Sequence, residues 1–204
     1  MLVAFAVFLP VRFGWLPQSA ALDLVVDVVG IIGAGIVIGL MAFGFFGARV
    51  GIAPGAKMAS VKVVNDDGFI YPEYAVCGFM EAGLKGMDVT NNSYYVDPFE
   101  FWCGDQPEQA PAMEAVRRAV TWSTEQGTVH AAAAGNSAYD LSDKTTNASS
   151  PNDAETPVAR TINSSCKDIP TELDGVVTVS SVDRQGKLSS FSNRGLGSID
   201  VAAP

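Results

Sequence analysis

The chain has 204 residues, 48% of them hydrophobic, which is enough apolar side chain for one domain with a single core and excludes an intrinsically disordered protein. Its formal net charge of −9 would repel nucleic acid and anionic membrane surfaces. We therefore expect no nucleic-acid partner, and an acidic balance of this kind favours a soluble, secreted protein.

The first 49 residues differ in composition from the rest. They carry only four charged side chains, so all of the net charge lies downstream, and they contain no Lys, Glu, Thr, Asn or Tyr. This break predicts a boundary near Val50. We expect a hydrophobic N-terminal segment over 1–49 and a folded domain over 51–204.

Residues 28–48 contain no charged or strongly polar side chain, and this length is sufficient for a membrane-spanning helix. Arg49 follows and would anchor such a helix at an interface. Two other interpretations stay open: a buried hydrophobic hairpin, or translation in a shifted reading frame. A signal peptide fits less well, because no basic residue precedes Arg12.

The remainder alternates between strand and helix patterns. Tyr74, Cys77, Met80 and Leu84 recur at helical spacing, and short β-branched runs between turn residues are typical of strands. The pattern predicts strands at 59–64, 87–92, 128–134, 175–182, 189–192 and 199–202, helices at 73–85 and 112–126, and irregular loops at 98–111 and 137–170. This alternation predicts an α/β domain with a mainly parallel sheet, whose ligand site lies at the carboxyl ends of the strands.

Three cysteines, Cys77, Cys103 and Cys166, show no zinc-binding or Cys-x-x-Cys spacing. In an exported protein we expect one disulfide and one remaining thiol. The spacing does not tell which pair forms, and in a cytosolic protein all three would be thiols.

Three loop carboxylates, Asp140, Asp143 and Asp153, could bind structural calcium, but they lack EF-hand spacing. We interpret them as solvated side chains. No metal site and no cofactor are predicted.

The Gly135-Asn136 pair ends the alanine-rich strand, and taken alone it indicates only a turn. It lies among motifs in a fixed order: 51–57 (GIAPGAK), 88–93 (DVTNNS), 131–137 (AAAAGNS), and 189–193 (SSFSN) leading to 200–204 (DVAAP). Together these motifs resemble the subtilisin-like serine proteases, or subtilases, over residues 51–204. The resemblance implies a three-layer α/β fold with a mainly parallel sheet, here incomplete at both ends.

The resemblance also assigns roles to two segments that follow strands. Asn136 matches the side-chain donor of the oxyanion hole, which stabilises the tetrahedral intermediate. The segment that pairs with an extended substrate matches Ser93, Tyr94 and Tyr95. The wall of the primary specificity pocket matches Ala133, Ala134 and Gly135. The two tyrosines are bulkier than the residues often found at their positions.

Catalysis in this family needs an Asp, a His and a Ser in Asp-Thr-Gly, His-Gly-Thr-His-like and Gly-Thr-Ser motifs. None of these motifs occurs here, and the place of the histidine motif is held by GLMAFGFFGARV. Asp23 and Asp27 have no matching context. The single histidine, His130, falls inside the alanine-rich strand, so we interpret it as a core residue.

These observations predict a serine endopeptidase by family, extracellular and acting on polypeptides, of which this chain is a truncated or mis-framed portion without activity. The alternative is a non-catalytic, membrane-attached pseudoprotease that binds extended peptides by strand addition. Complementation by another chain is a third hypothesis, which no motif supports.

Overall fold

The computed structural model describes residues 53–204, so the predicted segment 1–49 and its stretch 28–48 lie outside the described residues. The chain divides into two units, Met1–Met58 and Ala59–Pro204. The described part of the first unit contains a turn in which the Ala56 N–H donates to the Ala53 carbonyl at 3.1 Å.

Four parallel strands form the main sheet in the order β1-β3-β7-β8. The strands are β1 (Val89–Asn92), β3 (Val129–Ala133), β7 (Val176–Ser181) and β8 (Val201–Ala203). In register, Asn92 lies beside Ala132, and Val179 lies between Ala133 and Val201. The carboxyl ends of the four strands therefore meet at one edge of the sheet, and the predicted α/β class with a parallel sheet is confirmed.

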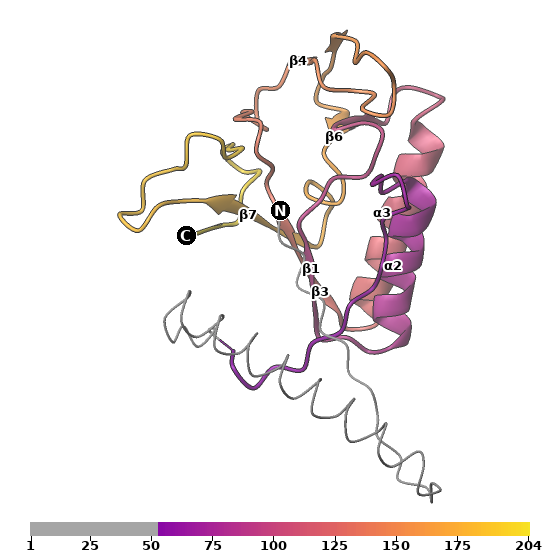
Figure 1. Cartoon of the computed structure of the whole chain (residues 1–204), viewed down its shortest axis with the longest axis vertical. Coiled ribbons are helices and arrows are strands. Elements are labelled where there is room, and N and C mark those ends of the chain that lie inside the picture. Colours follow the sequence, from indigo (N-terminus) through magenta and orange to yellow (C-terminus); the bar gives the residue numbers. More distant parts are fainter. Residues whose placement is uncertain (1–52) are drawn as a thin grey trace, which may run out of the picture. The chain divides into compact units, whose positions relative to one another are not determined.

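Two helices, α2 (Pro72–Leu84) and α3 (Ala110–Glu125), lie side by side on one face of this sheet (Figure 1). Pro72 occupies the first turn of α2, where its missing N–H costs nothing. The helices approach closely at Gly83, since a Cβ there would lie 2.7 Å from the Trp122 ring. No helix within 53–204 is long and apolar enough to cross a bilayer.

The main core lies between these helices and the sheet. On α3 the predicted apolar face is buried, with Val116 and Val120 fully enclosed, while Glu114 forms exposed ion pairs on the outer side. The core is completed by buried residues from the helices, strands and loops: Ala75, Phe79, Val96, Trp102, Ala119, Ala132, Ile169, Leu173 and Val176.

Two pairs of two-residue strands brace the loops. β2 (Trp102–Cys103) pairs with β6 (Cys166–Lys167), and β4 (Thr146–Asn147) pairs with β5 (Arg160–Thr161), both antiparallel. These strands fall within regions predicted as irregular loops, because two residues are too few to show a period.

Two predicted strands are wrong. Residues 59–64 form no strand, since no described strand runs beside them; instead Val63 packs against α2, where a Cβ on Gly78 would lie 2.6 Å from its Cγ1. Residues 189–192 form a turn, closed by the Ser192 N–H donating to the Ser189 carbonyl at 3.0 Å. The Oγ of Ser192 accepts a hydrogen bond from the Ser181 N–H at 2.9 Å, which fastens this turn to the end of β7.

Candidate active site

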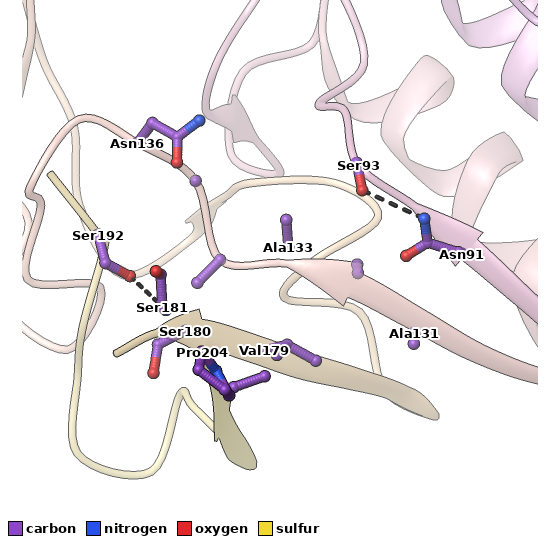
Figure 2. Close-up of a pocket in the computed structure, with 14 residues that line it drawn as sticks. Asn91, Ser93, Ala131, Ala133, Asn136, Val179, Ser180, Ser181, Ser192 and Pro204 are labelled. Carbon is purple, nitrogen blue, oxygen red and sulfur yellow. Dashed lines mark hydrogen bonds between the residues drawn. The ribbon is translucent and has the colours of Figure 1, made fainter. Parts of the chain in front are cut away.

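The predicted site residues come together at the carboxyl edge of the sheet. Ser93, Tyr94 and Tyr95 follow β1, and Ala134, Gly135 and Asn136 follow β3 directly after Ala133. A cavity of about 270 Å³ lies along this edge, lined by the ends of β1, β3, β7 and β8. Figure 2 shows Ser93 across the cavity from Ser180 and Ser181, with Ala133 between them and Asn136 on the loop beyond β3.

Asn136 is exposed, and its side-chain amide forms no hydrogen bond with the other residues that line this cavity (Figure 2). The loop that carries it is held in place by Asn193, whose Oδ1 accepts hydrogen bonds from the Ser137 N–H at 3.1 Å and the Tyr139 N–H at 2.9 Å. The Asn193 N–H donates to the Gly135 carbonyl at 2.9 Å. A rigid loop therefore presents a free amide donor at the sheet edge.

Only glycine fits at position 135, because of its backbone conformation and because a side chain would have no room. Its φ of +100° lies in the left-handed region, and a Cβ there would come within 2.5 Å of the Asn193 Nδ2. Asn193 ends the motif 189–193, but this motif by itself predicts no role for the side chain. Its function as the support of this loop depends on a contact between residues far apart in sequence.

The segment 93–95 continues β1 but has no neighbour in the sheet. Its backbone N–H and C=O groups make no backbone hydrogen bond with the other described residues, whereas Val96, next along the chain, donates to the Ile169 carbonyl at 2.9 Å. Ser93 is exposed, so these groups can pair with an added extended strand.

The two tyrosines of this segment are turned inward. The Tyr94 hydroxyl donates to the Asn92 Oδ1 at 3.1 Å, and burial raises the pKa of Tyr94 well above its ordinary value. The Tyr95 hydroxyl accepts a hydrogen bond from the Asn152 Nδ2 at 2.9 Å. The pKa of Tyr95 is also raised, first by burial and then by the neighbouring carboxylates of Asp97 and Glu100. Both tyrosines are therefore neutral hydrogen-bonding groups.

A second cavity, of about 380 Å³, lies between segment 93–95 and the loop after β3. Ser93, Ala133, Gly135 and Asn136 line both cavities, so the free amide stands where the two meet. The second cavity is also lined by polar residues that the sequence alone did not predict: Asp97, Glu100, Asn152 and Asp168. A signal for Asp168 was its position between Cys166 and the apolar pair Ile169-Pro170, which carry an acidic residue into the interior.

His130 lies in the core, as predicted. It is fully buried, its ring meets the Phe79 ring edge to face at 5.0 Å, and its Nδ1 is 2.7 Å from the Thr90 Oγ1. Burial lowers the pKa of His130, which keeps the imidazole neutral. It lines neither of the two cavities at the sheet edge.

Cys103 and Cys166 form a disulfide between β2 and β6, and Cys77 is an exposed thiol. Among residues 53–204, the one group with several metal-ligating atoms within 4.8 Å of one another is this disulfide with Asp105. Oxidised sulfurs are not thiolate ligands, so the cluster does not constitute a zinc site.

Two of the loop carboxylates considered for calcium are engaged by protein donors. Asp140 accepts hydrogen bonds from the N–H and hydroxyl of Ser142, which lower the pKa of this carboxyl. Asp153 accepts one from the Tyr71 hydroxyl at 3.1 Å.

The parallel sheet, with a free amide and two cavities at its carboxyl edge, defines an α/β protein with a ligand crevice at that edge. The model of the subtilase family matches residues 27–204. The chain therefore belongs to the subtilase family, the subtilisin-like serine proteases, and the predicted three-layer α/β fold is confirmed. The match starts upstream of the boundary predicted near Val50.

Solved structures of proteases are similar over about three quarters of the chain. A lanthipeptide protease is 22% identical with a TM-score of 0.55, covering 75% of this chain and 39% of that one. The epidermin leader peptide processing serine protease EpiP from Staphylococcus aureus, in a serine-to-alanine mutant form, is 26% identical with a TM-score of 0.60, covering 76% and 35%. The prenylagaramide maturation protease PagA is 19% identical with a TM-score of 0.51, covering 77% and 46%.

The chain thus spans less than half the length of these three structures. Comparison with curated proteins gives no match.

Proposed function

We propose that residues 51–204 form the substrate-binding part of a subtilisin-like serine endopeptidase, which hydrolyses peptide bonds through an acyl-enzyme. The observation that carries the proposal is the exposed Asn136 amide, which stands where the two cavities meet. A side-chain donor held at a fixed place by its loop stabilises an oxyanion without having to reorganise during the reaction.

Three parts of the crevice have separate tasks in this proposal. The unpaired backbone of segment 93–95 binds the substrate as an added strand. Ala133, Ala134 and Gly135 form one wall of the pocket that receives a substrate side chain. Asn136 donates to the carbonyl oxygen of the scissile bond as negative charge develops there.

The proposed substrate is a polypeptide in extended conformation. EpiP is a leader peptide processing protease by its title, and PagA is a maturation protease. A leader segment is an extended peptide that a sheet edge could bind. The Cys103–Cys166 disulfide supports export to an oxidising compartment, in keeping with a generally secreted family.

The chain contains none of the three triad motifs, so we propose that it does not cleave peptides by itself. The first test uses the purified 204-residue chain with labelled extended peptides. Fluorescence anisotropy should show binding, and mass spectrometry should show no cleavage. Cleavage that a serine-directed inhibitor blocks would refute the residue assignment, and absence of binding would refute the peptide-binding role.

A second test asks whether the gene encodes the missing groups. The DNA upstream of codon 50 is translated in the other two frames, and the DNA beyond codon 204 is translated in frame. If the histidine and serine motifs appear, a chain that includes them should cleave peptides, and Asn136→Ala should lower its kcat by about 10²–10³. If neither motif appears, the non-catalytic peptide-binding alternative replaces the endopeptidase.

A further inference from the structure

The second cavity has an acidic interior. Asp97, Glu100 and Asp168 line it and are only 6%, 4% and 2% exposed. No Lys, Arg or His is among the described residues that line this cavity. Its volume of about 380 Å³ lies within the range of about 300–1,000 Å³ typical of ligand pockets. Such a cavity attracts a cationic guest.

Asp168 is the carboxylate that lacks a partner. Its Oδ1 is buried and has no hydrogen-bond partner among the described residues. The nearby cation, Lys144, does not supply one, because its Nζ pairs with the Glu172 Oε1 at 2.5 Å. Glu172 also accepts the Asp168 N–H at 2.7 Å, which fixes the backbone of this residue. The side chain of Asp168 is therefore held in place but left unsatisfied.

The other two carboxylates are bound only by neutral donors. Asp97 accepts hydrogen bonds from the Ile70 N–H and from the Asn152 amide, the latter at 2.7 Å. Glu100 accepts hydrogen bonds from the side chains of Asn147, at 2.9 Å, and Ser149. These donors are neutral, so the contacts bring no positive charge into the cavity.

The neighbouring guanidinium, Arg160, is engaged outside the cavity. It donates to the Phe101 carbonyl and lies over the Phe99 ring at 4.6 Å. The Oδ1 of Asn152, which lines the cavity, is a further buried acceptor without a partner among the described residues. A ligand that pairs with the free acceptors of this cavity must therefore carry several hydrogen-bond donors as well as a positive charge.

A single metal ion does not fit this arrangement. A metal ion needs its ligand atoms close together, and the one such cluster within 53–204 contains the disulfide cysteines and Asp105. The oxygens of Asp97, Glu100 and Asp168 are spread more widely. Spread acceptors suit a flat or elongated cation with several N–H groups, such as a guanidinium.

The position of Asp168 relates the cavity to the scissile bond. Its Oδ2 would lie 3.6 Å from a Cβ placed on Gly135, the residue directly before Asn136. A substrate residue whose carbonyl oxygen meets the Asn136 amide would therefore extend its side chain past Gly135 toward the Asp168 carboxylate.

We infer that the second cavity selects a basic substrate residue, arginine above all, on the acyl side of the scissile bond, and that Asp168 is the specificity-determining carboxylate that receives its charge. This inference rests on the proposed function, because it takes the Asn136 amide as the place of the scissile carbonyl.

The test measures binding of labelled peptides to the full 204-residue chain by fluorescence anisotropy. The peptides are identical except at one position, which is arginine or citrulline, its uncharged isostere. The arginine peptide should bind about ten- to a hundredfold more tightly, as expected for hydrogen bonds to a charged group. Asp168→Asn should remove this preference, while Asp143→Asn, which removes an exposed carboxylate outside the cavity, should leave it unchanged.

Each outcome separates this inference from the proposed function. If both peptides bind equally to the unaltered chain, the peptide-binding role stands and the basic preference is wrong. If the preference persists in Asp168→Asn, the assignment to Asp168 is wrong. If neither peptide binds, the proposed function fails and this inference fails with it.

Discussion

Replacing Asp168 with asparagine should stabilise the fold at pH 8. The carboxylate is 2% exposed, and its Oδ1 has no hydrogen-bond partner among the described residues. Leaving one buried polar group unsatisfied costs about 1–3 kcal/mol, and more when the group is charged. Asparagine has nearly the same shape and keeps an unsatisfied oxygen but carries no charge, so Asp168→Asn should raise the free energy of unfolding by the excess cost of burying the charge, on the order of 1–3 kcal/mol.

The size of this effect depends on pH. Burial, followed by the charges of Glu172 and Glu100, raises the pKa of Asp168 well above 3.8, and Lys144 opposes this shift. The folded protein therefore keeps this proton to higher pH than the unfolded chain does. The contribution of Asp168 to stability is fully present below its unfolded pKa and is lost as pH rises through its folded pKa.

Urea denaturation followed by circular dichroism at several pH values between 4 and 8 would measure this effect. The difference between Asp168→Asn and the unaltered chain should grow as pH rises from 4. Asp143→Asn serves as the control, because Asp143 is exposed and should show no such pH-dependent gain. A difference that stays constant over this range, or a variant less stable at pH 8, would refute the reasoning.

Two further predictions concern the loop after β3 and the disulfide. Alanine would adopt a φ of +100° both in Gly135→Ala and in the control Gly127→Ala, and this backbone conformation costs about 1–2 kcal/mol. Only at position 135 would the new Cβ also clash with a side chain, because it would lie 2.5 Å from the Asn193 Nδ2. In urea titrations Gly135→Ala should therefore be the more destabilising, and equal losses would contradict the proposed contact. The Cys103–Cys166 disulfide spans 63 residues and restricts the unfolded chain, so replacing both cysteines with serine should lower the free energy of unfolding by about 4 kcal/mol. An unchanged urea midpoint would show that the bond does not constrain the unfolded chain.

Local patterns in the sequence were sufficient to predict the main elements of the fold. Helix α3 was predicted from the spacing of Val116, Ala119 and Val120, which are 0%, 4% and 0% exposed. Strand β3 was recognised because its small residues end at Gly135-Asn136. Both signals lie within a few consecutive residues and do not depend on distant contacts.

Features that depend on distant partners were not predictable in this way. The run 59–64 has the alternation of a strand, but a strand exists only beside a neighbour, and no described strand lies there. Which cysteines pair was decided by the antiparallel contact of β2 with β6. That contact joins two segments too short to leave a pattern in the sequence.

The two parts of the candidate site differ in the same way. Ser93 and Asn136 follow strands that the sequence reveals, so the resemblance to subtilases could place them. The acidic cavity draws Asp97, Asn152 and Asp168 from separate loops, and only the folded chain brings them together. A polar residue in a loop is usually solvated, and nothing local marks Asp97 and Asp168 as buried.

The Asp168 carboxylate has opposite effects on the stability of the free protein and on substrate binding. When it is ionised and no ligand is bound, this buried carboxylate destabilises the fold by about 1–3 kcal/mol. A basic peptide at a hundred times its Kd would stabilise the folded state by about 2.7 kcal/mol, which is of the same size. Because the bound cation favours the ionised form of Asp168, binding should lower its pKa and release a proton where the free carboxyl is still protonated. Asparagine at this position removes the destabilisation and the cation's partner together, so the variant that is most stable alone should gain least from the ligand.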